Sequence, residues 1–277
     1  MNNFEIIKPK NDILKQVIEY FLFIQYDAQN STKKYTTFPN NNSCLALYKS
    51  NHVHWDRKLN TCSIVDSNDA SIQSKLYAWH NMPFKVSIAG QLDQVCIVFS
   101  NTGLSQFTKK PLNSMSIVDD PFNEIFEREG RLFRQRLFEV NSNALRAALL
   151  EDFLLNKLLW RATPIVHDYM NFLKSSLVQD GSKINDFCKR HHISESALYR
   201  SCKEYIGESP KDIKSKLRFR LFIDHLNTTP RLTDIAYLLN YTDQAHLIKE
   251  VKKYTGLTPK KLASTMNVKQ DALVLIN

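Results

Sequence analysis

The side chains best suited to chemistry gather on two short helical stretches in the C-terminal half of the chain. On each stretch, polar, aromatic and basic residues project away from apolar positions such as Leu198 and Cys202. Arginine can form two hydrogen bonds with guanine, glutamine can bind adenine, and lysine can reach guanine or a phosphate. The two candidate sets are Ser196, Tyr199, Arg200 and Lys203 on the first stretch, and Gln244, Ala245, His246, Lys249 and Lys253 on the second. For His246, a contact at the start of its own helix is an equally good interpretation.

The elements that position these sets repeat. Each unit has a short helix with an apolar inner face, a tight turn, a capping residue (Ser194 or Asp243), and a second helix stopped by glycine and then proline. This layout predicts two helix-turn-helix units, each of which offers its second helix to a DNA major groove. The inner faces are predicted to be Ile184, Phe187, Cys188, Leu198, Cys202 and Tyr205 in the first unit, and Leu232, Ile235, Ala236, Leu239, Leu247, Val251 and Tyr254 in the second.

Residues 232–259, LTDIAYLLNYTDQAHLIKEVKKYTGLTP, resemble the C-terminal signature of the AraC/XylS family of bacterial transcription regulators. With the first unit and the linker helix, the resemblance covers about residues 166–263. It implies base-reading roles at 196, 199 and 200, and at 244, 245, 246 and 249. Asn240 departs from the glycine that the family usually places in the turn, but asparagine tolerates a positive φ well. Val251 stands where the family prefers phenylalanine.

A linker helix from Pro210 to Leu226 is expected to join the two units. A rigid linker would set the two reading helices about one DNA turn, ~34 Å, apart. Its basic side chains either contact the DNA backbone or form a solvated face. They are Lys211, Lys214, Lys216, Arg218 and Arg220.

The charge of the chain agrees with an anionic partner. The 277 residues carry a net charge of +9, and the part after Trp160 holds 19 basic and 12 acidic residues. A basic excess in one domain suits DNA, whose neutralised phosphates release counterions, although a solvated lysine-rich surface has the same composition. The excess is modest, which disfavours a binder without sequence preference.

Several function classes are disfavoured by composition. The six glycines are too dispersed for a phosphate-binding loop or a nucleophile elbow, and the five cysteines contain no Cys-x-x-Cys. No stretch is long and apolar enough to span a bilayer, and the N-terminus lacks a basic-then-apolar signal. We therefore expect a cytoplasmic, nucleoid-associated protein that is not an enzyme and needs no cofactor.

The N-terminal half reads as short apolar runs separated by Asn, Ser and Asp clusters. They lie at 44–48, 53–55, 61–65, 75–79, 84–89 and 95–99, a spacing that suggests an antiparallel barrel or sandwich. Residues 11–24 fit a helix or a strand equally well. Helical periodicity follows Pro121 and continues over 142–159. Because Pro164 can start a helix but not continue one, the predicted domains are 1–160 and 161–277.

The family resemblance implies a cupin-like N-terminal barrel with flanking helices that binds an effector or mediates dimerisation. The predicted fold is therefore α+β: this β-rich barrel, then an all-α domain of two helix-turn-helix units joined by a linker helix. The implied partners are double-stranded DNA, a small-molecule effector, a second copy of the chain and, for an activator, RNA polymerase. The motifs Phe38-Pro39, Gly103-Leu104 and Asp120-Pro121-Phe122 resemble an N-terminal domain of one branch of the family.

Other chemistry in this half is weakly supported. His52-x-His54 places two imidazoles on one side of a strand, but the remaining ligands of a cupin metal site are missing, so an exposed strand is preferred. His80 beside Trp79 is ambiguous. A group of aromatic residues fits an apolar effector pocket or simply the core: Tyr48, Trp55, Tyr77, Trp79 and Phe84. The alternative function is a catalytic sensor, such as one that repairs DNA damage through clustered thiols; Cys44, Cys62 and Cys96 read instead as buried structural residues.

Overall fold

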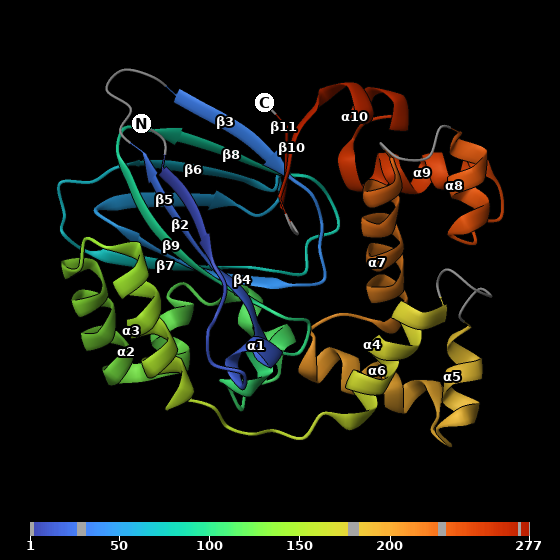
Figure 1. Cartoon of the computed structure of the whole chain (residues 1–277), viewed down its shortest axis with the longest axis horizontal. Helices are drawn as coiled ribbons and strands as arrows, with labels where there is room; N and C mark the ends of the chain where they lie inside the picture. The colour runs from blue at the N-terminus through green and yellow to red at the C-terminus, as the bar shows by residue number, and fades with distance from the viewer. Residues whose placement is uncertain (1–2, 27–31, 177–182, 227–230, 271–272, 277) are drawn as a thin grey trace. The chain divides into compact units, whose positions relative to one another are not determined.

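The computed structural model describes residues 3–26, 32–176, 183–226, 231–270 and 273–276. The chain divides into two compact units (Figure 1). The first, here the N-terminal unit, comprises residues 1–34, 42–78 and 85–161. The second, here the helical unit, comprises 35–41, 79–84 and 162–277. The predicted boundary near residue 160 agrees with this division except at two short segments of the N-terminal half. Residues 35–41 and 79–84 belong to the helical unit, because they contact its helices.

One sheet of the N-terminal unit has the order β1-β2-β9-β4-β7. Its neighbours run antiparallel, and the central strand β9 is buried along almost its whole length, from Gln94 to Phe99. An apolar run such as VCIVF suits a strand covered on both faces. The bounds are β1 Asn3–Ile7, β2 Ile18–Tyr26, β4 Ser43–Lys49, β7 Ile72–Tyr77 and β9 Leu92–Phe99.

The second sheet has the order β10-β11-β3-β8-β6-β5. In β8, Phe84, Val86 and Ile88 are buried and Lys85 is exposed, as the alternation of residue types predicts. Strands β6 and β8 pair in parallel, whereas β5 and β6 form an antiparallel hairpin. The bounds are β3 Thr32–Thr37, β5 Asn51–Asp56, β6 Thr61–Asp66, β8 Phe84–Ala89, β10 Met266–Gln270 and β11 Leu273–Ile276.

The predicted β-rich half is therefore confirmed, with its strands in two sheets that do not close into one barrel. Five of the six apolar runs lie wholly within strands, and the sixth, 75–79, extends two residues past the end of β7 at Tyr77. The ambiguous stretch 11–24 contains both elements: a single helical turn, α1 Leu14–Val17, leads directly into β2.

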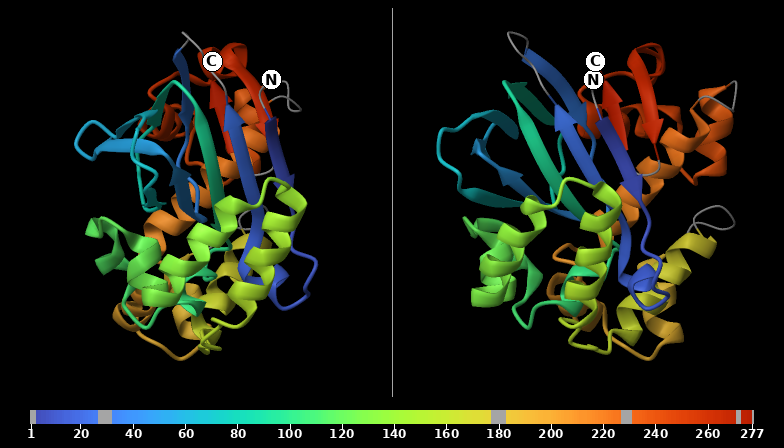
Figure 2. Two further views of the ribbon diagram at one scale, coloured as in Figure 1. Left: turned by 90° about the vertical axis from the view of Figure 1, so that its left-hand side faces the viewer. Right: turned by 60° about the vertical axis from the view of Figure 1, so that its left-hand side comes forward.

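Helices α2 and α3 pack against each other and lie over one end of the sheets (Figures 1 and 2). Helix α2, Pro121–Glu139, begins with Pro121 after an Asp120 cap that accepts a hydrogen bond of 3.3 Å from the Asn123 N–H. Helix α3, Asn143–Leu155, ends four residues before the predicted Leu159. Two 3₁₀ turns, η1 Leu104–Gln106 and η2 Leu112–Ile117, precede them.

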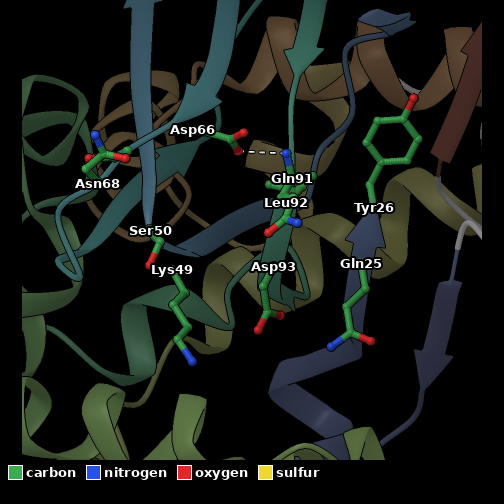
Figure 3. A pocket seen from close by; sticks show the side chains of 10 residues that line it. Gln25, Tyr26, Lys49, Ser50, Asp66, Asn68, Gln91, Leu92 and Asp93 are labelled. Atoms are coloured by element: carbon green, nitrogen blue, oxygen red, sulfur yellow. Dashed lines mark hydrogen bonds between the residues drawn. The ribbon is translucent and has the colours of Figure 1, made fainter. Parts of the chain in front are cut away.

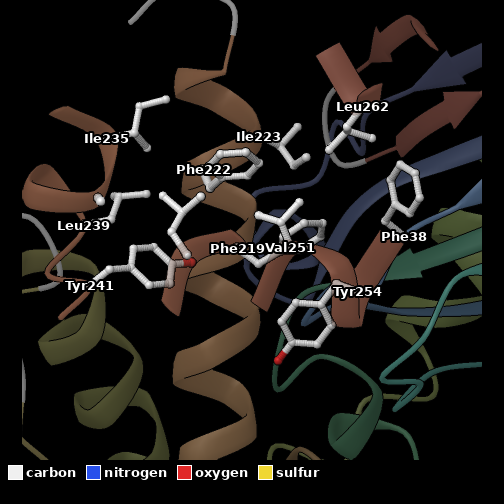
Figure 4. Packing of buried hydrophobic residues seen from close by; sticks show 12 residues of the cluster. Phe38, Phe219, Phe222, Ile223, Ile235, Leu239, Tyr241, Val251, Tyr254 and Leu262 are labelled. Carbon is white, nitrogen blue, oxygen red and sulfur yellow. The ribbon is translucent and has the colours of Figure 1, made fainter. Parts of the chain in front are cut away.

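The helical unit contains a cluster of helices with two hydrophobic cores. One core lies among α4, α5, α6 and the start of α7, and includes Leu173, Phe187 and Leu198. The other lies among α7, α8, α9 and α10, and Phe38 from the segment 35–41 contributes to it (Figure 4). The bounds are α4 Pro164–Ser176, α5 Ile184–Arg190, α6 Glu195–Tyr205, α7 Pro210–His225, α8 Leu232–Leu238, α9 Gln244–Thr255 and α10 Pro259–Thr265.

The two predicted helix-turn-helix units and their linker helix are therefore present between Pro164 and Thr265, and strands β10 and β11 follow them within the predicted domain 161–277. No helix among the described residues is long and apolar enough to cross a membrane.

Candidate nucleic-acid interface

The first helix-turn-helix unit consists of α5 and α6. Phe187 and Cys188 of α5 are buried, and His192 turns the chain with a φ of 53°. Ser194 then caps α6, because its hydroxyl accepts a 3.1 Å hydrogen bond from the Ala197 N–H. Buried Leu198 and Cys202 fix which face of α6 points inward. The opposite face is consequently free to meet a ligand.

The candidate residues of α6 lie on that outer face. Ser196 and Arg200 are exposed, and Tyr199 is 49% exposed although it is a large aromatic residue. Lys203 is half-buried, with its ammonium group 5.8 Å from the centre of the Tyr199 ring. Tyr199 and Lys203 thus form a cation–π pair beside Arg200.

The second unit, α8 and α9, has the same construction. Asn240 adopts a φ of 54°, so the replacement of the usual turn glycine by asparagine keeps the left-handed turn. Asp243 caps α9 by accepting a 2.7 Å hydrogen bond from the His246 N–H. Gly256 ends the helix with a φ of 71°, as the glycine terminator predicts.

The candidate residues of α9 are all exposed: Gln244, Ala245, His246, Lys249 and Lys253. The Lys253 ammonium lies 5.0 Å from the Tyr254 ring centre. His246 also makes the helix-start contacts of its alternative interpretation: its Nδ1 lies 3.4 Å from the Thr242 hydroxyl, and its ring meets Tyr241 edge-on at 5.3 Å. These contacts orient the imidazole and leave its outer edge exposed.

Helix α9 is fixed to the linker helix α7 through the buried carboxylate of Glu250. That carboxylate accepts hydrogen bonds from Arg218 at 3.1 and 2.6 Å, from the Tyr241 hydroxyl at 2.7 Å and from the Ser215 hydroxyl at 2.6 Å. Burial alone would raise the pKa of Glu250, but the hydrogen bonds and charge of Arg218, with help from Ser215 and Tyr241, lower it below its ordinary value. The charged form therefore holds the second reading helix on the linker.

Two of the basic residues of the linker helix that were predicted to contact the DNA backbone point into the protein instead. Lys216 is fully buried and pairs with Glu208, because α7 turns this position into the protein. Arg218 lies in the network just described, over the ring of Tyr241 at 4.1 Å. For both residues, the prediction of a DNA contact or a solvated face is wrong. Lys211 is exposed, and Lys214 and Arg220 are partly buried.

The weaker sites of the N-terminal half stay apart. His52 and His54 are exposed on the same face of β5, opposite Val65 and Ser63, and no metal-binding cluster of His, Cys, Asp or Glu exists among the described residues. Tyr48 is buried, and its hydroxyl lies 2.8 Å from that of Tyr77. The Tyr77 ring packs against Trp55 at 5.3 Å, so these aromatics contribute to packing.

The cysteines are reduced, and most are buried. Burial raises the pKa of Cys62 to about 11. The pKa of Cys44 is raised well above its ordinary value, mainly by the contact with the Cys96 thiol and also by burial. A thiol with a raised pKa is a poor nucleophile at neutral pH. This disfavours a thiol-transfer centre at these residues.

Sequence reasoning missed one set of contacts in the helical unit, which comes from the segment 79–84. The indole N–H of Trp79 donates a hydrogen bond to the Ile206 carbonyl, at the end of α6. Gly207 has a φ of 90°, and a Cβ at this position would overlap the Trp79 ring. Both the positive φ and the lack of space for a side chain therefore require glycine at position 207. In the sequence, Gly207 itself was the only residue that could have indicated this contact.

His80, in the same segment, is half-buried, and its Nε2 atom is fully buried. Its Nε2 has no hydrogen-bond partner among the residues that the structure describes. Burial, together with the charges of Lys216 and Arg220, lowers the pKa of His80 to about 3. The imidazole is thus neutral at any physiological pH, and its ring packs against Phe84 at 5.9 Å.

Comparison with known proteins locates the match in this part of the chain. Residues 187–265 match the family model of a helix-turn-helix domain. No curated protein matches the sequence. Among solved structures, the C-terminal domain of AraT, a response regulator from Geobacillus stearothermophilus, is 21% identical with a TM-score of 0.36, over 39% of this chain and 90% of that one.

Two structures of ToxT from Vibrio cholerae are also similar, at 12% and 14% identity. They cover 84% of this chain and 97% and 96% of their own, with TM-scores of 0.44 and 0.42. Because every one of these scores is below 0.5, the assignment depends on the family match and on the motif residues. Residues 187–265 are therefore similar to a helix-turn-helix domain, and this range contains the motif at 232–259 that resembles the AraC/XylS signature.

Proposed function

We propose that the chain is a sequence-specific transcription regulator that reads two successive major-groove segments with α6 and α9. The observation that carries the proposal is the exposure of base-reading side chains on both second helices, each fixed by a capped N-terminus and a buried inner face. Charged and aromatic side chains that are held on a rigid helix and left in solvent suit recognition more than stability.

The roles follow from side-chain chemistry. Arg200 donates two hydrogen bonds to guanine, Gln244 binds adenine, and Lys249 donates to guanine. Ser196, Tyr199, Ala245 and His246 contact neighbouring base edges or thymine methyl groups. Lys203 and Lys253 lie toward the C-terminal ends of their helices, where phosphate contacts position the protein on the duplex.

In this proposal the N-terminal unit senses a small effector or pairs with a second copy of the chain. An activating form also contacts RNA polymerase, and the protein acts in the cytoplasm, on the nucleoid. Catalysis forms no part of the proposal.

The experiment is selection from a fragmented genomic DNA library by the full-length protein, followed by sequencing of the retained fragments. We expect enrichment of a motif with two segments one helical turn apart. The variant Arg200→Ala/Lys249→Ala should lose the motif, whereas Lys260→Ala, which removes an exposed charge from α10, should keep it. Retention of DNA without any motif, or equal loss in both variants, would contradict base reading.

A further inference from the structure

The two reading helices are joined through one rod, the linker helix α7. Its first turns contribute Ile213 to the core of the first helix-turn-helix unit, and its later turns contribute Phe219 and Phe222 to the core of the second. Within the described part of the chain, the two core clusters share only the partly buried Leu221, which also belongs to α7. The separation of α6 and α9 therefore depends on how α7 is held against each of them.

The two connections of α7 differ in kind. Toward α9, the buried pair of Arg218 and Glu250 holds it. Toward α6, the connection is the short corner 206–209, which contains Gly207 with a φ of 90°. Glycine adopts and leaves such a conformation more readily than any other residue. A glycine corner between two helices can act as a hinge, so other contacts must fix the angle between α6 and α7.

Trp79 supplies such a contact at the corner. Its indole N–H donates a hydrogen bond to the carbonyl of Ile206, which ends α6, and its ring occupies the space that a Cβ at Gly207 would need. The next residue, Glu208, forms a buried ion pair with Lys216 of α7. One indole therefore holds both the end of the first reading helix and the glycine that follows it.

The segment 35–41 holds the linker helix itself. The side-chain amide of Asn41 donates a 3.1 Å hydrogen bond to the Ile213 carbonyl, and the ring of Phe38 meets Phe219 edge-on at 6.4 Å (Figure 4). Both side chains are buried. Asn41 thus contacts the part of α7 that belongs to the first unit, and Phe38 contacts the part that belongs to the second.

We propose that Trp79 is a positioning residue for DNA reading, which fixes the angle between α6 and α7 and so sets the spacing of the two DNA segments that the protein accepts. Asn41 and Phe38 support it by holding α7. All three residues lie outside 187–265, the region that matches the family model. The inference rests on the proposed function, because it requires that one chain reads two segments.

Spacing is a sensitive readout because the two segments lie on a helix. One inserted base pair moves the second segment by about 3.4 Å and turns it by about 35° around the axis. A rigid protein then has to distort the DNA, whereas a protein with a loose corner follows the second segment. A loss of stability weakens binding to every spacing alike, so only a positioning role changes the preference among spacings.

The test is a fluorescence anisotropy titration of the full-length protein with the selected motif and with versions that carry additional base pairs between its segments. We expect the unaltered protein to bind each altered spacing about tenfold more weakly. In Trp79→Phe, which keeps a ring but loses the N–H donor, the preference should fall to about threefold. Asn41→Ala should reduce it in the same direction. Trp55→Phe makes the same change at a half-buried tryptophan of the N-terminal unit and should keep the full preference.

A second readout needs no DNA. Spin labels at Glu195→Cys on α6 and Lys252→Cys on α9, both exposed positions, report the distance between the reading helices. The background is Cys44→Ser, because the other four cysteines are buried. Pulsed electron resonance should give a broader distribution of distances in Trp79→Phe than in the chain without it, and an unchanged distribution in Trp55→Phe.

Circular dichroism and urea denaturation establish that each variant is folded at the assay temperature, and Asn41→Ala carries both readouts if Trp79→Phe is not. The inference is overturned if the folded variants keep both the spacing preference and the narrow distribution, or if Trp55→Phe loses them to the same extent. A protein that enriches no motif with two segments contradicts the proposed function itself. The distance distribution then still tests the corner, so the two failures are distinguishable.

Discussion

Arg218 of the linker helix α7 holds Glu250 of the second reading helix with hydrogen bonds of 3.1 and 2.6 Å, and both side chains are almost fully buried. The position of α9 relative to α7 therefore depends on a charge pair as well as on the apolar core of Figure 4. Any change to the pair alters the surface that meets DNA without touching a base-reading residue.

Replacing Glu250 by glutamine should destabilise the protein by about 3 kcal/mol, because the buried Arg218 loses its charged partner. Urea denaturation at pH 7 measures the change. The difference from the unaltered protein should shrink as the pH falls below the ordinary carboxyl value of 4.5. A pKa lowered by folding contributes stability above that value and loses it as the protein itself takes up the proton. A constant difference down to low pH would contradict the charge pair.

His80 should make the helical unit less stable in mild acid. Its pKa is about 3 in the folded protein and about 6.5 in the unfolded chain, so below pH 6.5 the unfolded chain binds the additional proton. Stability should fall by up to about 1.4 kcal/mol per pH unit from this residue alone. In His80→Phe this part of the slope should vanish between pH 6.5 and 5. If stability fell with pH equally steeply in the unaltered protein and in His80→Phe, His80 would have to take up its proton in the folded state as well.

The approach of Trp79 to Gly207 predicts a non-additive pair of substitutions. Gly207→Ala should cost about 2–5 kcal/mol, because the methyl group meets the indole and the φ of 90° is strained for alanine. In a Trp79→Ala background only the conformational part, about 1–2 kcal/mol, should remain. Urea denaturation measures the loss of unfolding free energy caused by Gly207→Ala. An equal loss in the unaltered protein and in Trp79→Ala would show that the indole does not contact Gly207.

The elements and caps of the helical unit were predictable because their causes are local. Ser194 and Asp243 accept hydrogen bonds from the N–H groups three residues ahead, and Asn240 takes the positive φ that the turn demands. The strands were predictable for the same reason, since alternation such as that of Phe84, Val86 and Ile88 needs only one buried face.

What the sequence did not predict depends on distant partners. Lys216 and Arg218 are residue types that usually lie on a solvated basic face. Only the fold brings Glu208 next to Lys216 and Glu250 next to Arg218. Trp79 contacts Ile206 across 127 positions of the chain, which no periodicity encodes. The residues Gln25, Lys49 and Asp93 are a similar case, because they become neighbours only through strand register (Figure 3).

The inner face of the second helix-turn-helix unit predicts a matched pair of substitutions on α8. Ile235 is fully buried and Tyr237, two residues later, is 88% exposed. Ile235→Asp should destabilise the unit by more than about 4 kcal/mol and reduce helical circular dichroism, because a buried carboxylate without a partner is very costly. Tyr237→Asp should change stability by less than about 0.5 kcal/mol. A normally folded Ile235→Asp protein would show that the inner face is wrong.

Base reading and phosphate binding should separate in the salt dependence of DNA binding. Arg200 is exposed on the outer face of α6, and Lys211 is exposed near the start of the linker helix. Arg200→Ala should weaken binding to the selected motif by about 1–3 kcal/mol and leave binding to random DNA nearly unchanged, because a base contact acts only on its own sequence. Lys211→Ala should weaken binding to both DNAs alike and reduce the slope of log affinity against log salt by about 1, since one phosphate contact is lost. The measurement is a fluorescence anisotropy titration on the two DNAs over a series of salt concentrations. If Arg200→Ala shifted both DNAs equally and flattened the slope as Lys211→Ala does, Arg200 would be a backbone contact, and sequence would have to be read by the remaining residues of α6 and by α9.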